Sequence, residues 1–191
     1  MKKIVIIWLC ITSLANAQDS IVIQGNLHNN SHFAKVIVNK FGVGSFAIAA
    51  APITNQKFSL AAPSTIEPGV YRFQYSQTTS DYVDVIINGK EKNSSFTLDV
   101  MLLQEQRKPV FSQSLENKNW YDYQNQSQLQ LQKITALQQA LSGYPIPQDL
   151  IVAQIKKALN QEQNIFKKQE ALFLKKNANT WAGSMVQNTP Y

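Results

Sequence analysis

The feature that most constrains the fold is a change in the spacing of apolar residues at Pro109. Before Pro109, short runs such as residues 21–23 and 70–75 are rich in β-branched residues or alternate large apolar with polar residues, which is typical of strands. After it, apolar residues recur at intervals of three and four, which is typical of amphipathic helices. The sequence therefore predicts a β-rich part followed by a helical part.

The first part predicts about seven short strands at intervals of roughly ten residues, a spacing typical of a β-sandwich. Gly25 is expected to close the first strand. Asn88-Gly89 is a strong hairpin signal because both residues tolerate positive φ, and it is expected to join strands over residues 82–87 and 95–102. We therefore expect an antiparallel β-sandwich domain over residues 18–108.

The second part, residues 109–191, predicts a long helical hairpin and a short C-terminal segment. The first helix is expected to begin near Ser114 and to end at Gly143, and the second to follow Pro147 and to end near Asn177. One apolar stripe comprises Trp120, Tyr123, Leu131, Ile134, Leu137 and Leu141, and the other comprises Ile151, Ile155, Ala158, Leu159, Ile165, Phe166, Leu172 and Phe173. A cap at Asn179-Thr180 would start a further apolar segment. The predicted fold class is α+β.

The N-terminus predicts a secretory signal peptide over residues 1–17. Two lysines precede an apolar stretch, and Ala15-Asn16-Ala17 fits a cleavage site. The apolar stretch of about 11 residues is shorter than the roughly 20 residues that cross a bilayer as a helix, so no stable transmembrane anchor is expected. We expect export to the periplasm or cell envelope. Cleavage would also remove Cys10, the only cysteine, so thiol chemistry by the mature chain is excluded.

Few residue patterns in the sequence can support catalysis. His28 and His32 flank a predicted turn and lack a third ligand, which indicates loop histidines rather than a metal site. Asp81 and Asp84 would point to opposite faces of a strand, which argues against paired acid–base chemistry. The serines and threonines of residues 76–80 lack a nucleophile elbow, and no phosphate-binding glycine loop occurs. We therefore expect a non-enzymatic protein without cofactors or metals.

Three aromatic residues, Trp120, Tyr121 and Tyr123, are the candidate ligand or partner contacts. Their rings could stack on a sugar or a peptide while their polar ends stay hydrated. The alternative is packing, because Trp120 and Tyr123 share the apolar stripe of a helix. Tyr121 would point elsewhere and is the exposed member of this set.

The formal net charge of the chain is +6. Apart from the two lysines of the predicted leader, the excess of basic over acidic residues lies in the second half of the chain. The pairs at residues 156–157, 167–168 and 175–176 fall mostly opposite the second apolar stripe, where a helix normally carries solvated charge. A basic helix could also contact anionic lipid or nucleic acid, but export argues against nucleic acid as a partner. The glutamine-rich residues 124–139 are expected to form helix surface.

Several segments resemble one family of bacterial envelope proteins. They are residues 21–27, 56–60, 68–73, 85–91, 96–99, 109–121 and 173–182. These segments are similar to the β-rich domain and helical region that precede the thioredoxin domain in envelope thiol-disulfide oxidoreductases of the TlpA-like or peroxiredoxin-like type.

Members of that family continue into a thioredoxin-like domain with a Cys-x-x-Cys site, whereas no residue of this sequence matches either catalytic cysteine. The resemblance thus implies an accessory module that positions or recognises an envelope protein or a thioredoxin-like domain. If the helices normally contact a further domain, Trp181 and Met185 would be exposed. The alternative left open is an autonomous protein that binds an envelope glycan or peptide.

Overall fold

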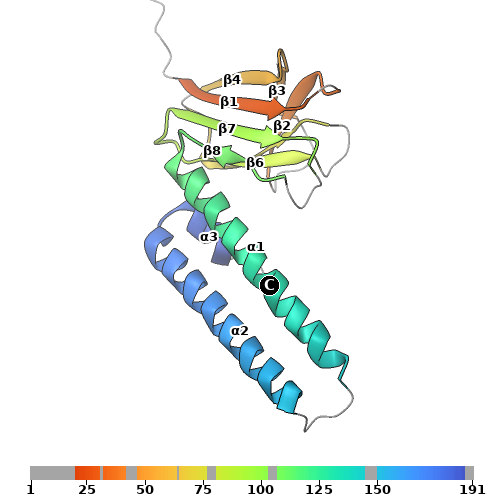
Figure 1. Ribbon diagram of the computed structural model, residues 1–191. Helices are drawn as coiled ribbons and strands as arrows, with labels where there is room; N and C mark the ends of the chain where they lie inside the picture. The colour runs from red at the N-terminus through yellow and green to blue at the C-terminus, as the bar shows by residue number, and fades with distance from the viewer. Residues whose placement is uncertain are drawn as a thin grey trace, which may run out of the picture.

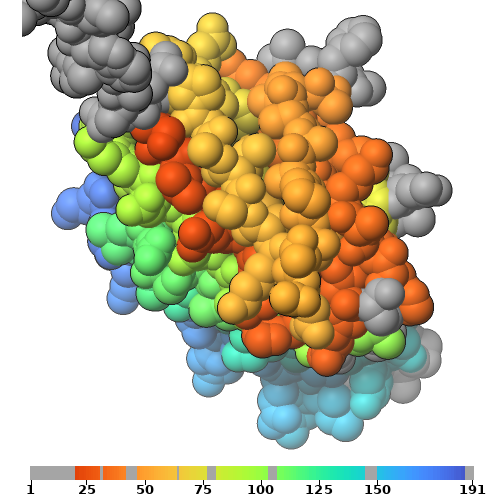
Figure 2. All heavy atoms as spheres, turned by 90° about the horizontal axis from the view of Figure 1, so that it is seen from above, coloured from red at the N-terminus to blue at the C-terminus, as the bar shows by residue number. Residues whose placement is uncertain are grey.

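The computed structural model describes residues 20–30, 32–41, 47–63, 65–76, 81–102, 107–144 and 150–187. The predicted signal peptide, residues 1–17, lies outside the described residues. Strands occupy one end of the molecule, and two long helices extend away from it side by side (Figure 1). Viewed from the strand end, the red-to-yellow strand residues stand in front of the cyan and blue helices (Figure 2). The predicted α+β class is confirmed.

The described strands form two four-stranded sheets. Sheet A has the order β4-β1-β7-β8 and sheet B the order β3-β2-β5-β6. The strands are β1 (Ser20–His28), β2 (Lys35–Lys40), β3 (Ala49–Pro52), β4 (Lys57–Pro63), β5 (Gly69–Gln74), β6 (Tyr82–Ile87), β7 (Asn93–Asp99) and β8 (Val110–Phe111). Inward side chains from both sheets form one apolar core, so the sheets make a sandwich.

The strand pairing of sheet A differs from the sequence prediction in two respects. β1 and β7 are parallel, with Gly25 opposite Phe96, while the other strand pairs are antiparallel. A strand, β8, also lies beyond Pro109 and pairs with β7. Because β8 has only two residues, it gives no alternating pattern from which it could be predicted.

Gly25 lies inside β1 rather than at its end, so the predicted end of this strand is wrong. The reason is the packing of Phe58, whose ring fills the space beside Gly25. A Cβ atom on residue 25 would lie 2.0 Å from Phe58 Cε1. The glycine therefore serves a close approach within the core rather than a turn.

The turn at Asn88-Gly89 is confirmed, but the hairpin is wrong. Gly89 has φ of 74°, and the Asn88 side chain accepts hydrogen bonds from the backbone N–H of Lys90 and Glu91. β6 belongs to sheet B and β7 to sheet A, so this turn carries the chain across the sandwich. Local turn chemistry does not specify which sheet receives the next strand.

The helices begin and end close to the predicted residues. They are α1 (Leu115–Ser142), α2 (Leu150–Asn177) and α3 (Trp181–Gln187). Ser114 caps α1 by accepting from Asn117 N, and Thr180 caps α3 by accepting from Gly183 N. The carboxylate of Glu91 accepts hydrogen bonds from the first two N–H groups of α1, where the helix dipole favours negative charge.

The two long helices contact each other as the predicted hairpin, but the second apolar stripe is only partly covered. Phe166 is buried, whereas Ile151, Ile165 and Leu172 remain 46%, 44% and 59% exposed. A single neighbouring helix covers a narrower strip than the sequence pattern spans. The glutamine-rich residues 124–139 were expected to form helix surface, but Gln130 is buried. Its side-chain amide donates a hydrogen bond to the Glu162 carbonyl at 3.0 Å.

Candidate functional site: a groove between sheet B and the helices

The first turns of α1 are attached to the edge strand β6 by two side chains. Asn117 accepts from Ile86 N at 2.7 Å and donates to Ile86 O at 2.8 Å. Four residues later in α1, the Tyr121 hydroxyl accepts a hydrogen bond from Asp84 N at 3.1 Å and donates one to Asp84 O at 2.9 Å. Two side chains of a helix thus satisfy backbone groups that a neighbouring strand would otherwise satisfy.

This arrangement follows from matching repeats. Four residues of a helix rise about 6 Å, and two residues of a strand rise about 6.7 Å. Asn117 and Tyr121 are therefore spaced to meet alternate residues of β6. The sequence reading missed Asn117, since nothing in its neighbourhood marks an asparagine that is fully buried by tertiary contacts.

Tyr121 is not the exposed aromatic that the sequence predicted. Its ring stacks on Phe111 with a centroid separation of 5.3 Å and packs against the sandwich core. Burial of the hydroxyl is the main reason that the pKa of Tyr121 lies well above its usual range. Tyr121 therefore fixes α1 on sheet B, although part of its ring also lines the groove described below.

Trp120 and Tyr123 are both 5% exposed and belong to a second apolar cluster outside the sandwich core. Trp120 lies with Val70 and Ile86 of sheet B and with residues of α3. Tyr123 stacks on Phe173 of α2 with a centroid separation of 4.2 Å. Most of the surface of Trp120 and Tyr123 is therefore buried by packing, as the alternative interpretation expected.

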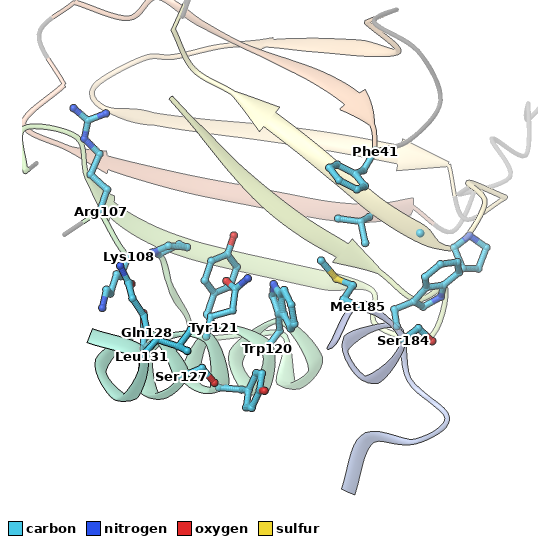
Figure 3. Close-up of a pocket in the computed structure, with 18 of the residues that line it drawn as sticks. Phe41, Arg107, Lys108, Trp120, Tyr121, Ser127, Gln128, Leu131, Ser184 and Met185 are labelled. Atoms are coloured by element: carbon cyan, nitrogen blue, oxygen red, sulfur yellow. The ribbon is translucent and has the colours of Figure 1, made fainter. Parts of the chain in front are cut away.

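A groove of about 940 Å³ lies between sheet B, α1 and α3, beside the contacts that join them. Trp120, Tyr121 and Phe41, which follows β2, line the groove (Figure 3). Tyr123 of α1 and Trp181 of α3 also line it. Phe41 is 56% and Trp181 42% exposed. The sequence reading did not select Phe41, and it named Trp181 only as a residue exposed if the helices contact a further domain. The positions of both around one groove depend on how three separate elements meet.

The charged residues of the groove lining are all basic. Lys40, Arg107 and Lys108 line the groove, and its lining contains no carboxylate among the described residues. Lys40 is paired with Glu67, and Arg107 is paired with Asp81. Within the described part of the chain Lys108 makes no ion pair, so it contributes the uncompensated charge of this surface.

One buried hydroxyl on the groove wall lacks a partner. Ser127 is 5% exposed, lines the groove beside Trp120, and its Oγ makes no hydrogen bond within the described residues. A buried hydroxyl without a partner is costly. This unsatisfied hydroxyl lies within the wall of the groove rather than on its surface.

His28, His32, Asp81 and Asp84, which were considered for catalysis, do not line the groove. His28 ends β1 and His32 precedes β2. Asp84 forms a bidentate pair with Arg72 at 2.9 and 3.0 Å, and Asp81 pairs with Arg107. Over the residues that the structure describes, no three histidine, cysteine, aspartate or glutamate side chains form a group that could hold a metal ion.

Comparisons with protein-family models, with curated protein sequences and with solved structures gave no match. The resemblance to envelope oxidoreductases therefore stays a prediction. Among the described helices, none has the length and apolar character needed to cross a membrane.

Proposed function

We propose that this protein is a non-catalytic recognition module whose groove binds a partner polypeptide in the cell envelope. The observation that carries the proposal is the pair of exposed aromatics, Phe41 and Trp181, on the walls of a groove of about 940 Å³. Large exposed aromatics around a concavity are enriched at recognition sites because they bury much apolar area on binding.

The shape and chemistry of the groove favour a peptide segment with an apolar side chain. Trp181, Met185 and Phe41 offer apolar contacts, whereas Lys108 and Gln128 offer polar ones. The volume lies at the upper end of the roughly 300–1,000 Å³ range of small-ligand sites. A site of this volume can accommodate several residues of a partner chain.

The resemblance described above favours a thioredoxin-like domain of an envelope thiol-disulfide oxidoreductase as the partner. In that family the corresponding region adjoins the redox domain, so a module without catalytic cysteines would position or recognise such a domain. We propose this partner first and other envelope proteins second.

Site-directed photo-crosslinking tests the proposal. A photoreactive residue at position 181, expressed in the source cell, should crosslink one envelope protein through the groove. The purified partner should then bind the wild-type chain saturably in calorimetry. Because a central tryptophan typically contributes about 2 kcal/mol or more, Trp181→Ala should weaken binding by about 30-fold or more.

Leu129→Ala is the matched control, since Leu129 is 56% exposed on α1 but does not line the groove. It should bind as the wild type does. Equal binding by Trp181→Ala and the wild type would refute the groove as the site. Turnover of a disulfide substrate above that of a heat-treated sample would refute the non-catalytic assignment.

The second candidate is an envelope glycan. Gln124, Asn125 and Gln128 place side-chain amides along the same groove as Trp120 and Trp181, and sugars are often held by amides together with aromatic faces. Titration with soluble fragments of envelope polysaccharide distinguishes the two. Heat that saturates and disappears in Trp181→Ala supports the glycan, whereas flat titrations over a broad set exclude it.

A further inference from the structure

We propose that the outer face of α2 binds the surface of an anionic lipid bilayer. This face is defined by a lysine row, Lys157, Lys168 and Lys175, and by an adjacent apolar row, Ile151, Ile165 and Leu172. It is separate from the groove, whose lining contains no residue of α2. The two proposals can therefore fail independently.

The charged residues of α2 are mostly positive. The helix carries six lysines and two glutamates, and all six lysines are exposed. Within the described residues none of these lysines makes an ion pair. Lys157 and Lys175 are eighteen residues apart, which is five helical turns, so they lie on one line of the helix surface. The face therefore presents uncompensated positive charge along its length.

The apolar row is the part of the second stripe that α1 leaves uncovered. Ile151, Ile165 and Leu172 are spaced by multiples of seven residues and are all more than 40% exposed. Lys168 and Lys175 lie four residues before and three residues after Leu172, so they flank it on the helix surface. Apolar side chains bordered by lysines fit the boundary between lipid headgroups and acyl chains.

A lipid surface explains both rows together, which other anionic partners do not. Phosphates of nucleic acid would attract the lysines but offer little to exposed Ile165 and Leu172. The helix is 28 residues long and thus spans about 42 Å. Charge distributed over that length suits an extended surface better than a compact acidic site.

Sedimentation with vesicles tests this proposal on the chain from residue 18, which contains every described element and lacks the apolar leader. We expect binding to phosphatidylcholine vesicles that contain about 30% phosphatidylglycerol and none to pure phosphatidylcholine. Near 1 M salt, where the Debye length is about 3 Å, binding should be largely lost. The triple variant Lys157→Gln, Lys168→Gln, Lys175→Gln should bind at least about tenfold more weakly.

The matched control removes the same charge elsewhere. Lys35, Lys57 and Lys90 are exposed on the sandwich, and their triple replacement by Gln should leave vesicle binding within about twofold of the wild type. An equal loss in both triple variants would overturn the proposal, because binding would then follow net charge alone. Salt-sensitive binding to duplex DNA without binding to anionic vesicles would overturn it in favour of nucleic acid.

The apolar row has its own variant pair. Ile165→Ser with Leu172→Ser should reduce vesicle binding, because these side chains are proposed to enter the headgroup region. Met101→Ser with Leu102→Ser removes exposed apolar residues, 66% and 41% exposed, from another surface and should not reduce it. Unchanged binding of the α2 pair would contradict insertion. Circular dichroism of each variant checks that the helices remain folded.

Discussion

Gly25 and Phe58 show how one residue without a side chain determines the packing of an aromatic in the core. The Phe58 ring stacks on Phe73 at 5.9 Å and meets Phe96 edge-on at 5.8 Å, so it is held from two further sides. A ring that is 4% exposed cannot move into solvent to make room for a Cβ atom. The position therefore tolerates no side chain without displacement of neighbouring rings.

We expect Gly25→Ala to lower the free energy of unfolding by about 1–3 kcal/mol, the usual range for an overpacked core. Urea denaturation measures this change. The double variant Gly25→Ala with Phe58→Leu should cost less than the two single changes combined, since the smaller side chain accepts the new methyl group. Additive costs would contradict a direct clash between the two residues.

At this scale the sequence predicts caps better than contacts. Ser114 and Thr180 were predictable because a cap acts on backbone groups two or three residues away. Tyr121 was predicted to be exposed because the helical pattern identifies the face toward α2 but carries no signal for the face toward β6. Contacts over long sequence separation leave no local pattern.

At the scale of elements, α1 and β6 are joined as if the helix were a strand. Asn117 is buried and exchanges two hydrogen bonds with Ile86, so replacing it leaves two backbone groups of β6 without partners. Each unsatisfied buried group costs about 1–3 kcal/mol. The helix is therefore attached by polar contacts of defined register rather than by apolar packing alone.

We expect Asn117→Ala to destabilise the protein by about 2–4 kcal/mol, measured by urea denaturation. Asn119→Ala is the matched control, since Asn119 lies on the same helix and its side chain makes no hydrogen bond within the described residues. It should change stability by less than about 0.5 kcal/mol. Similar losses in the two variants would show that helix propensity, rather than the edge contact, is responsible.

Element positions could be predicted from the sequence, whereas element partners could not. The two helices and most strands lie where periodicity indicates, because local pattern depends on the burial of one face. The exchange of sheets after Asn88-Gly89, the parallel pairing of β1 with β7, and the groove all depend on distant segments meeting. The three candidate aromatics of α1 were found by residue type, whereas the positions of Phe41 and Trp181 on one groove became clear only from the fold.

At the scale of the whole molecule, two buried tyrosines and the partly buried Tyr121 make stability depend on alkaline pH. Burial raises the pKa of Tyr71, Tyr75 and Tyr121 above the usual value of 10.0. Raised folded-state pKa values favour folding while the tyrosines are neutral, so this stability is present below pH 10. It is lost as the pH rises above the pKa of the unfolded tyrosines.

We therefore expect the free energy of unfolding to decline from about pH 10 upward. Urea denaturation over the range from pH 8 to the alkaline limit measures the decline. Tyr121→Phe should be less stable at neutral pH, because it loses two hydrogen bonds, but should show a shallower decline. An identical slope in this variant would contradict a buried, neutral Tyr121 hydroxyl.

The attachment of α1 to β6 also limits how the two parts of this chain can be separated in evolution. A gene fragment for residues 18–108 would encode the sandwich without β8 and without the side chains that occupy the backbone of β6. Such a fragment should polymerise edge to edge, as light scattering would show. A recombined gene that encodes this sandwich as a soluble product must therefore also encode the first turns of α1.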